Sequence, residues 1–224
     1  MVTRERDDLV IRVDGRRPLS AELVAAFEVL CDRVEDRADR NTVIMHVSGA
    51  PGEPSNEALT IALVSKWERA LRRFERLPAA TVAVASDECG GVALEALLAT
   101  DYRIGTASLR LLMARRALVT WPGMALYRIV RQAGSAAARR AVLLGIPITA
   151  ADAVATGLID ELTVDTQAAL TAAMELAEAI PGPELAIRRQ LMHDAPAVSF
   201  EEALGAHLAA CERALRLSSA EAGR

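Results

Sequence analysis

The stretch Thr81-Val-Ala-Val-Ala-Ser-Asp-Glu-Cys-Gly-Gly-Val-Ala-Leu-Glu95 decides the fold class of this chain. Residues 81–85 are almost wholly apolar, which is typical of a strand covered on both faces and hence of a parallel sheet. The segment from Cys89 to Ala99 is predicted to be a helix led by Gly90 and Gly91. The stretch therefore predicts an α/β fold in which a buried strand turns sharply into a helix.

The glycine pair at this junction has two interpretations. Glycines let the backbone approach a ligand closely, and the N–H groups of a first helical turn point outward with the positive end of the helix dipole behind them. Such a place can stabilise an oxyanion. A Gly-Gly pair before a helix is also common as simple turn geometry, and the residues alone leave both interpretations open.

Apolar patterns on either side extend the alternation of strands and helices. Short apolar runs predict strands, and apolar residues at helical spacing predict amphipathic helices, the first with Ser20 as its N-cap. The expected strands are 9–13, 43–47, 81–85, 102–104 and 109–113, and the expected helices are 21–35, 57–74 and 89–99, with nearly continuous helix from Pro122 onward that is broken at Gly134, Gly145 and Gly157. Strands and helices alternate early and helices dominate later, which favours βαβ units followed by helices used for packing or assembly.

Length and composition exclude several classes of protein. The chain has 224 residues, of which 52% are hydrophobic, so we expect one domain with a substantial core. Lys and Arg number 26 against 30 Asp and Glu, a net charge of -4, so no global basic field would gather nucleic acid or anionic lipid. The N-terminus lacks the apolar stretch of a signal peptide, and no apolar run approaches the roughly 20 residues of a membrane span. We therefore expect a cytoplasmic protein that binds neither nucleic acid nor membrane.

The cysteines and histidines predict neither a disulfide framework nor a metal centre. The cysteines are odd in number, far apart and without ligand-like spacing: Cys31, Cys89 and Cys211. None of the histidines has a metal-compatible neighbour in the sequence: His46, His193 and His207. No metal is therefore expected.

Four stretches of the chain carry a family resemblance: Leu71–Pro78; Ala79–Ser86 followed by Gly90–Glu95 and Asp101; Trp121–Arg128; and Leu144–Ile159. In this order they resemble the helix and proline, the glycine turn and helix, the Pro-Gly segment and the downstream helix-turn signature of the crotonase, or enoyl-CoA hydratase/isomerase, superfamily. The resemblance covers roughly residues 9–204, with the family's triple glycine reduced. It implies a crotonase-like ββα spiral over residues 1–164 and a C-terminal helical trimerisation region, 165–224, that packs on this core within one functional domain.

The resemblance also implies a site. The backbone N–H groups of Val92 and, in the loop after Gly49, of Ser55 would bind the oxygen of an acyl-CoA thioester. Glu95 falls at one of the two catalytic glutamates of hydratases and would move the proton of the adjacent carbon. From the residues alone, Glu95 could equally be a solvated helix residue.

Further residues implied to lie near the substrate are Gly91, Arg115 and Trp121. Arg115 falls where the second glutamate of the family stands, and an arginine cannot act as a general base. It could pair with Glu95, bind an acidic or phenolic substrate, or point into solvent. The departure favours chemistry that needs one carboxylate, such as dehydration, isomerisation or assisted enolisation, over ordinary hydration.

Within the superfamily, residues 63–73, residues 121–127 and the short length are most similar to the B component of the dihydroxyphenylglycine pathway of actinobacterial glycopeptide-antibiotic makers. This implies a lyase that assists a type III polyketide synthase by dehydration and aromatisation toward 3,5-dihydroxyphenylacetyl-CoA. Coenzyme A would enter as part of the substrate, with no separate cofactor. The resemblance further implies a homotrimer or hexamer.

Two other functions stay open at this stage. A catalytically degenerate accessory protein could keep the fold and stabilise or stimulate another enzyme, such as the synthase. A serine peptidase is disfavoured, because the chain has no Gly-x-Ser-x-Gly elbow and Ser86 precedes the glycine turn.

Overall fold

The computed structural model describes residues 9–37, 42–51, 59–113, 115–116, 119–120 and 123–222. Its main sheet has the strand order β1-β2-β3-β4-β9, with β5 beside the end of β3 and β8 beside β5. The strands are β1 Val10–Asp14, β2 Thr42–Gly49, β3 Ala80–Gly90, β4 Tyr102–Thr106, β5 Arg110–Leu112, β8 Ile148–Thr149 and β9 Glu161–Thr163. All pairs in it are parallel except β5 with β8, so the predicted parallel sheet is confirmed.

Strand β3 is buried from Ala80 to Ala85 but runs further than the sequence predicts. Asp87 has a left-handed φ of 54°, and the register with β2 shifts between Ser48 and Gly49. Beyond this irregularity the strand continues, and Cys89 and Gly90 pair with β5. The predicted helix from Cys89 to Ala99 was therefore too long, because its first two residues hydrogen-bond as a strand.

The helices largely follow the predicted amphipathic segments. They are α1 Ala21–Glu35, α2 Ile61–Phe74, α3 Val92–Leu97, α4 Gly123–Leu144, α5 Ala150–Ala155, α6 Thr166–Glu178, α7 Gly182–Asp194 and α8 Phe200–Ala222. Ser20 caps α1 by accepting from the Leu23 N–H, as predicted. Thr60 caps α2, so that helix begins at Ile61 and not at Glu57, which lies outside the described residues. Gly134, at φ 81°, interrupts α4 where the sequence predicted a break.

A short antiparallel hairpin, β6 Arg115–Arg116 with β7 Val119–Thr120, was not expected from the sequence. Strands β8 and β9 were missed as well. Each has only two or three residues, too few for an alternating pattern to be recognised.

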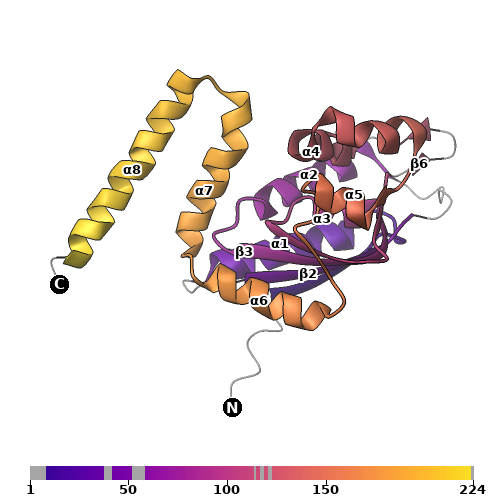
Figure 1. The fold of residues 1–224 in the computed structure, drawn as a ribbon, viewed down its shortest axis with the longest axis horizontal. Coiled ribbons are helices and arrows are strands. Elements are labelled where there is room, and N and C mark those ends of the chain that lie inside the picture. Colours follow the sequence, from indigo (N-terminus) through magenta and orange to yellow (C-terminus); the bar gives the residue numbers. More distant parts are fainter. Residues whose placement is uncertain are drawn as a thin grey trace, which may run out of the picture.

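The sheet has two covered faces, as Figure 1 shows with α6 on one side and α2 to α5 on the other. On the larger side, apolar residues of α1 to α5 pack against the sheet around Phe27, Trp67 and Leu94. On the other side, α6 packs against residues of β2, β3 and β4, among them Ile44 and Val82. The residues of α6 in this contact are Ala169, Leu170 and Ala173. This two-sided burial explains why β3 is apolar at consecutive positions.

The C-terminal helices differ in how they meet the core. Helix α7 is attached to the chain just before β3, because the Arg189 guanidinium forms an ion pair with Asp101 and donates to the carbonyl oxygens of Leu77 and Ala79. Helix α8 packs against α7, and the two form a hairpin that stands away from the sheet (Figure 1). None of the side chains described in α8 is buried.

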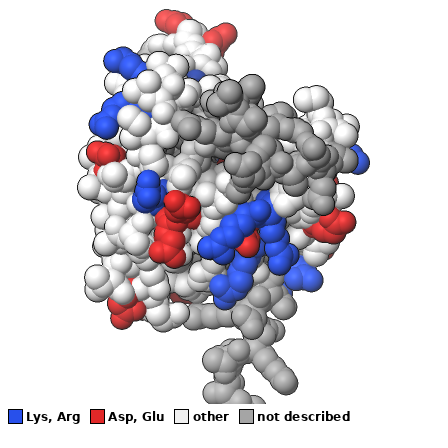
Figure 2. Space-filling model, turned by 90° about the vertical axis from the view of Figure 1, so that its right-hand side faces the viewer, with Lys and Arg blue, Asp and Glu red and all other residues white. Residues whose placement is uncertain are grey.

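The surface carries both signs of charge. On the face at the right of Figure 1, Lys and Arg side chains gather around acidic ones (Figure 2). None of the helices in the described ranges is both long and apolar enough to span a membrane.

Gly182 provides a test of how α7 is attached. A Cβ atom at Gly182 would overlap the Pro78 carbonyl oxygen. We expect Gly182→Ala to lower the free energy of unfolding by about 2 kcal/mol, because overpacking costs roughly 1–3 kcal/mol. The matched control is Gly205→Ala in α8, which has open space around it and should raise that free energy by about 0.5–1 kcal/mol. Urea unfolding measures the free energy of unfolding of both variants. Equal changes of this free energy in the two variants would contradict the tight contact at Gly182.

Candidate active site

The chain segments that follow β1, β2 and β3 meet through their backbones. Gly15 donates its N–H to the Ser48 carbonyl oxygen at 2.8 Å. A Cβ atom at Gly15 would overlap the carbonyl oxygens of both Gly49 and Gly90. Glycine is needed here because any side chain would push the three segments apart.

Helix α3 begins at this meeting point. Gly91 is its N-cap, with a left-handed φ of 55° and no side chain that caps the helix. A Cβ atom there would lie 3.0 Å from the Cγ of Pro51, so the loop after Gly49 approaches the start of α3. The first N–H groups of an α-helix have no acceptor within the helix. The structure therefore brings Gly91 close to Pro51, the last residue described before the segment in which the second N–H donor was predicted.

Several predicted site residues fall at or beyond the limits of the described ranges. Ser55 and Trp121 lie outside them, and of Arg115 only the backbone is described, paired with Thr120. The two oxyanion donors and the place of Arg115 thus stay predictions. Glu95, by contrast, is fully described and can be examined in detail.

Glu95 is buried in α3, with 8% of the residue exposed, and is not on a solvated helix face. Its Oε2 atom accepts a 2.7 Å hydrogen bond from the Trp67 Nε1–H of α2. Burial raises the pKa of Glu95 from 4.5 to about 7; the indole hydrogen bond opposes this shift, Glu68 adds to it and Arg128 opposes it. A carboxyl group that titrates near neutral pH is suited to general acid–base catalysis.

The position of Trp67 is fixed by aromatic packing. The Phe27 ring of α1 meets the Trp67 ring edge to face, with centroids 4.8 Å apart, and also contacts Phe74. The apolar spacing in residues 57–74 predicted the helix that carries Trp67 but not the contact of Trp67 with Glu95. A buried indole N–H usually has an acceptor, and this was the one signal that could have pointed to a nearby carboxylate.

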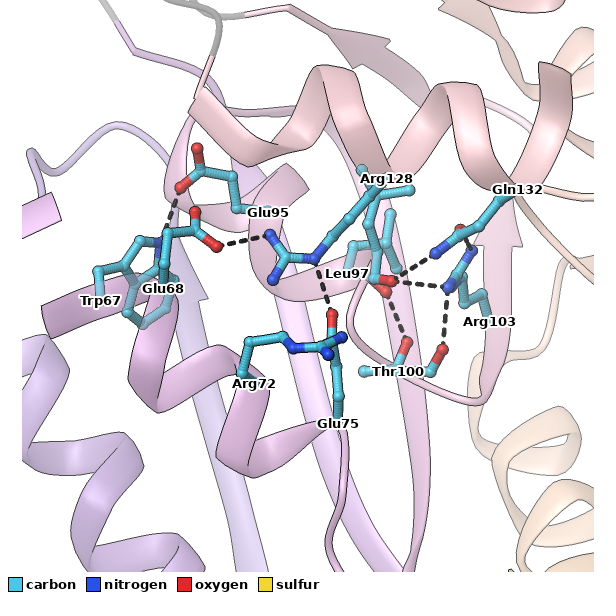
Figure 3. A network of polar contacts seen from close by, with 11 residues as sticks. Trp67, Glu68, Arg72, Glu75, Glu95, Leu97, Thr100, Arg103, Arg128 and Gln132 are labelled. Carbon is cyan, nitrogen blue, oxygen red and sulfur yellow. Dashed lines mark hydrogen bonds and ion pairs between the residues drawn. The ribbon is translucent and has the colours of Figure 1, made fainter. Parts of the chain in front are cut away.

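A network of charged side chains continues from Glu95 toward α4 (Figure 3). Arg128 of α4 donates to Glu68 at 2.9 Å and to Glu75 at 2.8 Å, and Arg72 also pairs with Glu75. Arg128 and Glu75 are buried, and burial raises the pKa of Glu68 against the opposing effect of Arg128. These residues were not predicted as part of the site.

The histidine of β2 lies on the opposite side of the sheet from Glu95. His46 is on the α6 side of the sheet, since it follows Ile44 by two residues in β2, and burial with the neighbouring Arg12 lowers its pKa. Within the parts of the chain that the structure describes, no three His, Cys, Asp or Glu side chains form a group that could hold a metal ion. The absence of a metal stays a prediction.

Comparison with known proteins identifies the family. A family profile described as enoyl-CoA hydratase/isomerase matches residues 54–215. The chain belongs to the enoyl-CoA hydratase/isomerase family. It is 52% identical over 209 residues to a protein of Amycolatopsis orientalis named enoyl-CoA-hydratase, covering 93% of this chain and 96% of that one.

Solved structures of this family share the fold. An enoyl-CoA hydratase/isomerase from Marinobacter aquaeolei has a TM-score of 0.78 at 17% identity, over 92% of this chain and 87% of its own. An enoyl-CoA hydratase from Mycobacterium smegmatis has a TM-score of 0.78 at 16% identity, over 92% and 88% of the two chains. The expected crotonase-like α/β fold is thereby confirmed.

The raised pKa of Glu95 predicts a dependence of stability on pH. Between about pH 4.5 and pH 7 the folded chain keeps a proton on Glu95 that the unfolded chain releases, so the free energy of unfolding falls as pH rises through this window. The full effect is about 3 kcal/mol. Glu95→Gln removes the titrating group, so we expect it to match the parent chain near pH 4.5 and to be more stable by up to about 3 kcal/mol above pH 7.

Urea unfolding at the two ends of this pH range measures the difference between the two chains. A stability difference that does not change with pH would show that Glu95 titrates normally in the folded protein.

Proposed function

We propose that this protein is a lyase that removes water from an acyl-CoA thioester, with Glu95 as the group that moves the proton. The observation that carries the proposal is the buried Glu95 carboxyl, with its pKa raised to about 7, one turn after the N-terminus of α3. The family consists of hydratases and isomerases of such thioesters, which supports the substrate class.

In the proposed reaction the thioester oxygen accepts hydrogen bonds from the Val92 N–H and from an N–H of the loop after Gly49. These bonds stabilise the enolate that forms when the ionised Glu95 takes the proton from the adjacent carbon. The enolate then expels hydroxide from the next carbon, and Glu95 returns its proton to the leaving group as water. A carbon–carbon double bond forms, and Glu95 ends in its starting state.

We propose further that the substrate is a polyketide thioester and that the protein assists a type III polyketide synthase toward 3,5-dihydroxyphenylacetyl-CoA. Supporting this are the resemblance of residues 63–73 and 121–127 to the B component described above, and the 52% identity to a protein of Amycolatopsis orientalis. Loss of water from a cyclised polyketide yields an aromatic ring. In the proposed reaction this loss moves one proton, which a single carboxylate can carry. The basic side chains gathered in Figure 2 suit the phosphates of coenzyme A.

A second candidate function is an accessory role without chemistry of its own. It is favoured by Arg115 at the place of the family's second glutamate and by the reduced glycine turn, in which Val92 follows Gly91. In that case the chain would change the rate or stability of a synthase and leave thioesters unchanged by itself.

Glu95→Gln separates these two functions. We expect the purified parent chain to release water from 3-hydroxyacyl or polyketide thioesters, and Glu95→Gln to lose at least about 100-fold in kcat, because general acid–base catalysis contributes roughly 100- to 10,000-fold. Glu88→Gln is the matched control, since Glu88 is exposed and its carboxylate lies 3.9 Å from Arg110 at the surface.

Mass spectrometry of the thioesters, with and without the synthase, measures both variants. Full activity of Glu95→Gln would remove Glu95 from the mechanism. Stimulation of the synthase by Glu95→Gln as strong as by the parent chain, with no turnover by either alone, would establish the accessory role.

We also propose that the chain forms a homotrimer or a hexamer. Helix α8 carries a stripe of exposed apolar residues at spacings of four and three: Phe200, Leu204, Leu208, Cys211 and Leu215. Such spacing is typical of helices that pack against other helices. A second copy of the chain would cover this stripe.

Light scattering on a size-exclusion column tests the assembly. The parent chain is expected to elute with at least three times the mass of its 23.9 kDa protomer, and Leu208→Glu with less, because a charge would be buried in the interface. A monomeric parent chain at micromolar concentration would contradict the proposal.

A further inference from the structure

The side chains around Glu95 form a cluster in which cations pair with two of three carboxyl groups. Glu68 and Glu75 form ion pairs with Arg128, which is buried, and Glu75 also pairs with Arg72, whose side chain is half exposed. The buried Arg103 adds its positive charge on the side of Glu75. A buried charge without a paired cation is unfavourable, so the cluster is most stable when the remaining carboxyl group keeps its proton.

The contacts indicate which carboxyl group that is. Glu68 accepts from Arg128, and Glu75 accepts from both Arg128 and Arg72. The hydrogen bond described for Glu95 comes from the neutral indole of Trp67 instead. Figure 3 shows Arg128 between Glu68 and Glu75, and Glu95 lies on the far side of Glu68 from Arg72.

Glu68 is the carboxylate whose charge acts on Glu95. It directly follows Trp67 in α2, and both carboxyl groups lie near the indole of Trp67 in Figure 3. Its Oε2 atom binds Arg128, and a hydrogen bond from the Met124 backbone also lowers the pKa of its carboxyl group. Both contacts favour the ionised form of Glu68, whose negative charge raises the pKa of Glu95 in addition to burial.

We propose that Glu68 is a positioning residue that strengthens Glu95 as a base, by placing a second negative charge in the same cluster. This inference rests on the proposed function, because it concerns the proton that Glu95 moves. Glu68 does not take a proton from the substrate itself, since Arg128 holds it in an ion pair. Its charge adds to the effect of burial, so that both forms of Glu95 are accessible near neutral pH and one carboxyl group can serve as base and then as acid.

Other charged groups on the packed elements are placed so that they act weakly on Glu95. Arg12 and His46 are paired in register on the α6 side of the sheet. At the outer end of the cluster, His193 of α7 faces Glu75 and Arg72, and burial lowers its pKa. On the surface, Glu88 lies opposite Arg110, and Asp87 accepts from Ser108.

The indole of Trp67 is a direct probe of the proton on Glu95. Its Nε1–H donates to Glu95, so its chemical shift follows the charge of that carboxyl group. The chain has two tryptophans, so a proton–nitrogen NMR spectrum has two indole signals, and Trp121→Phe assigns them. A titration of the parent chain is expected to show a midpoint near pH 7 for Trp67.

In Glu68→Gln we expect the midpoint of the Trp67 signal to fall by about one pH unit or more, because a like charge has been removed while Arg128 stays. Glu68→Asp keeps the charge and should restore most of the parent value. His193→Gln and Glu88→Gln are controls that should leave the midpoint in place. If Glu68→Gln does not fold, Glu75→Gln removes a charge one contact further away and should lower the midpoint by a smaller amount.

The pH dependence of kcat for thioester dehydration provides the second measurement. Its acidic limb should move to lower pH in Glu68→Gln together with the NMR midpoint. An unchanged Trp67 midpoint in Glu68→Gln would overturn the inference even if the enzyme is active. A shifted midpoint in a chain that never releases water from a thioester would instead overturn the proposed function and leave the assignment of the proton intact.

Discussion

The backbone contact among the segments after β1, β2 and β3 decides where the rest of the candidate site lies. Gly15 touches both neighbouring segments, and a side chain there would separate them. Because these strands are parallel, their carboxyl ends share one edge of the sheet, and the contact draws that edge together at the start of α3. Val92 then lies at the first turn of α3, and Glu95 lies about one turn further along the helix in the core.

The position of Glu95 is unfavourable for stability and favourable for chemistry. Burial of the carboxyl group raises its pKa, and the hydrogen bond from Trp67 offsets this rise only in part. The aromatic contact with Phe27 holds the indole in place, so the hydrogen bond does not depend on a mobile side chain. Buried carboxyl groups with strongly shifted pKa values cluster at functional sites.

Local sequence patterns predicted most strands and helices, whereas the strand ends and the side-chain contacts of the site depend on residues distant in sequence. The apolar run at 81–85 and the cap at Ser20 depend on neighbouring residues, and both were predicted from the sequence. The carboxyl end of β3 was not predicted, because Cys89 becomes part of the strand through pairing with Gly49 of β2 and Leu111 of β5, which are distant in sequence. The hydrogen bond from Trp67 to Glu95 joins residues 28 positions apart on two helices, and no sequence periodicity predicts such a contact. Glu95 itself was found through a resemblance, whereas its burial and its charged neighbours required the structure.

In the proposed reaction Glu95 alone would move the proton, and the same carboxyl group would serve addition of water, since addition retraces the path of elimination. The second glutamate expected for a hydratase of this family is absent, because residue 115 is an arginine here. Glu68 does not replace it as a base, since its carboxylate is engaged by Arg128. It can only change the electrostatic potential at Glu95. In an elimination the departing hydroxyl group needs only the proton that Glu95 has just removed, so one carboxyl group with a suitable pKa is sufficient. The second carboxylate of this site therefore acts through its charge, and the proton stays with Glu95.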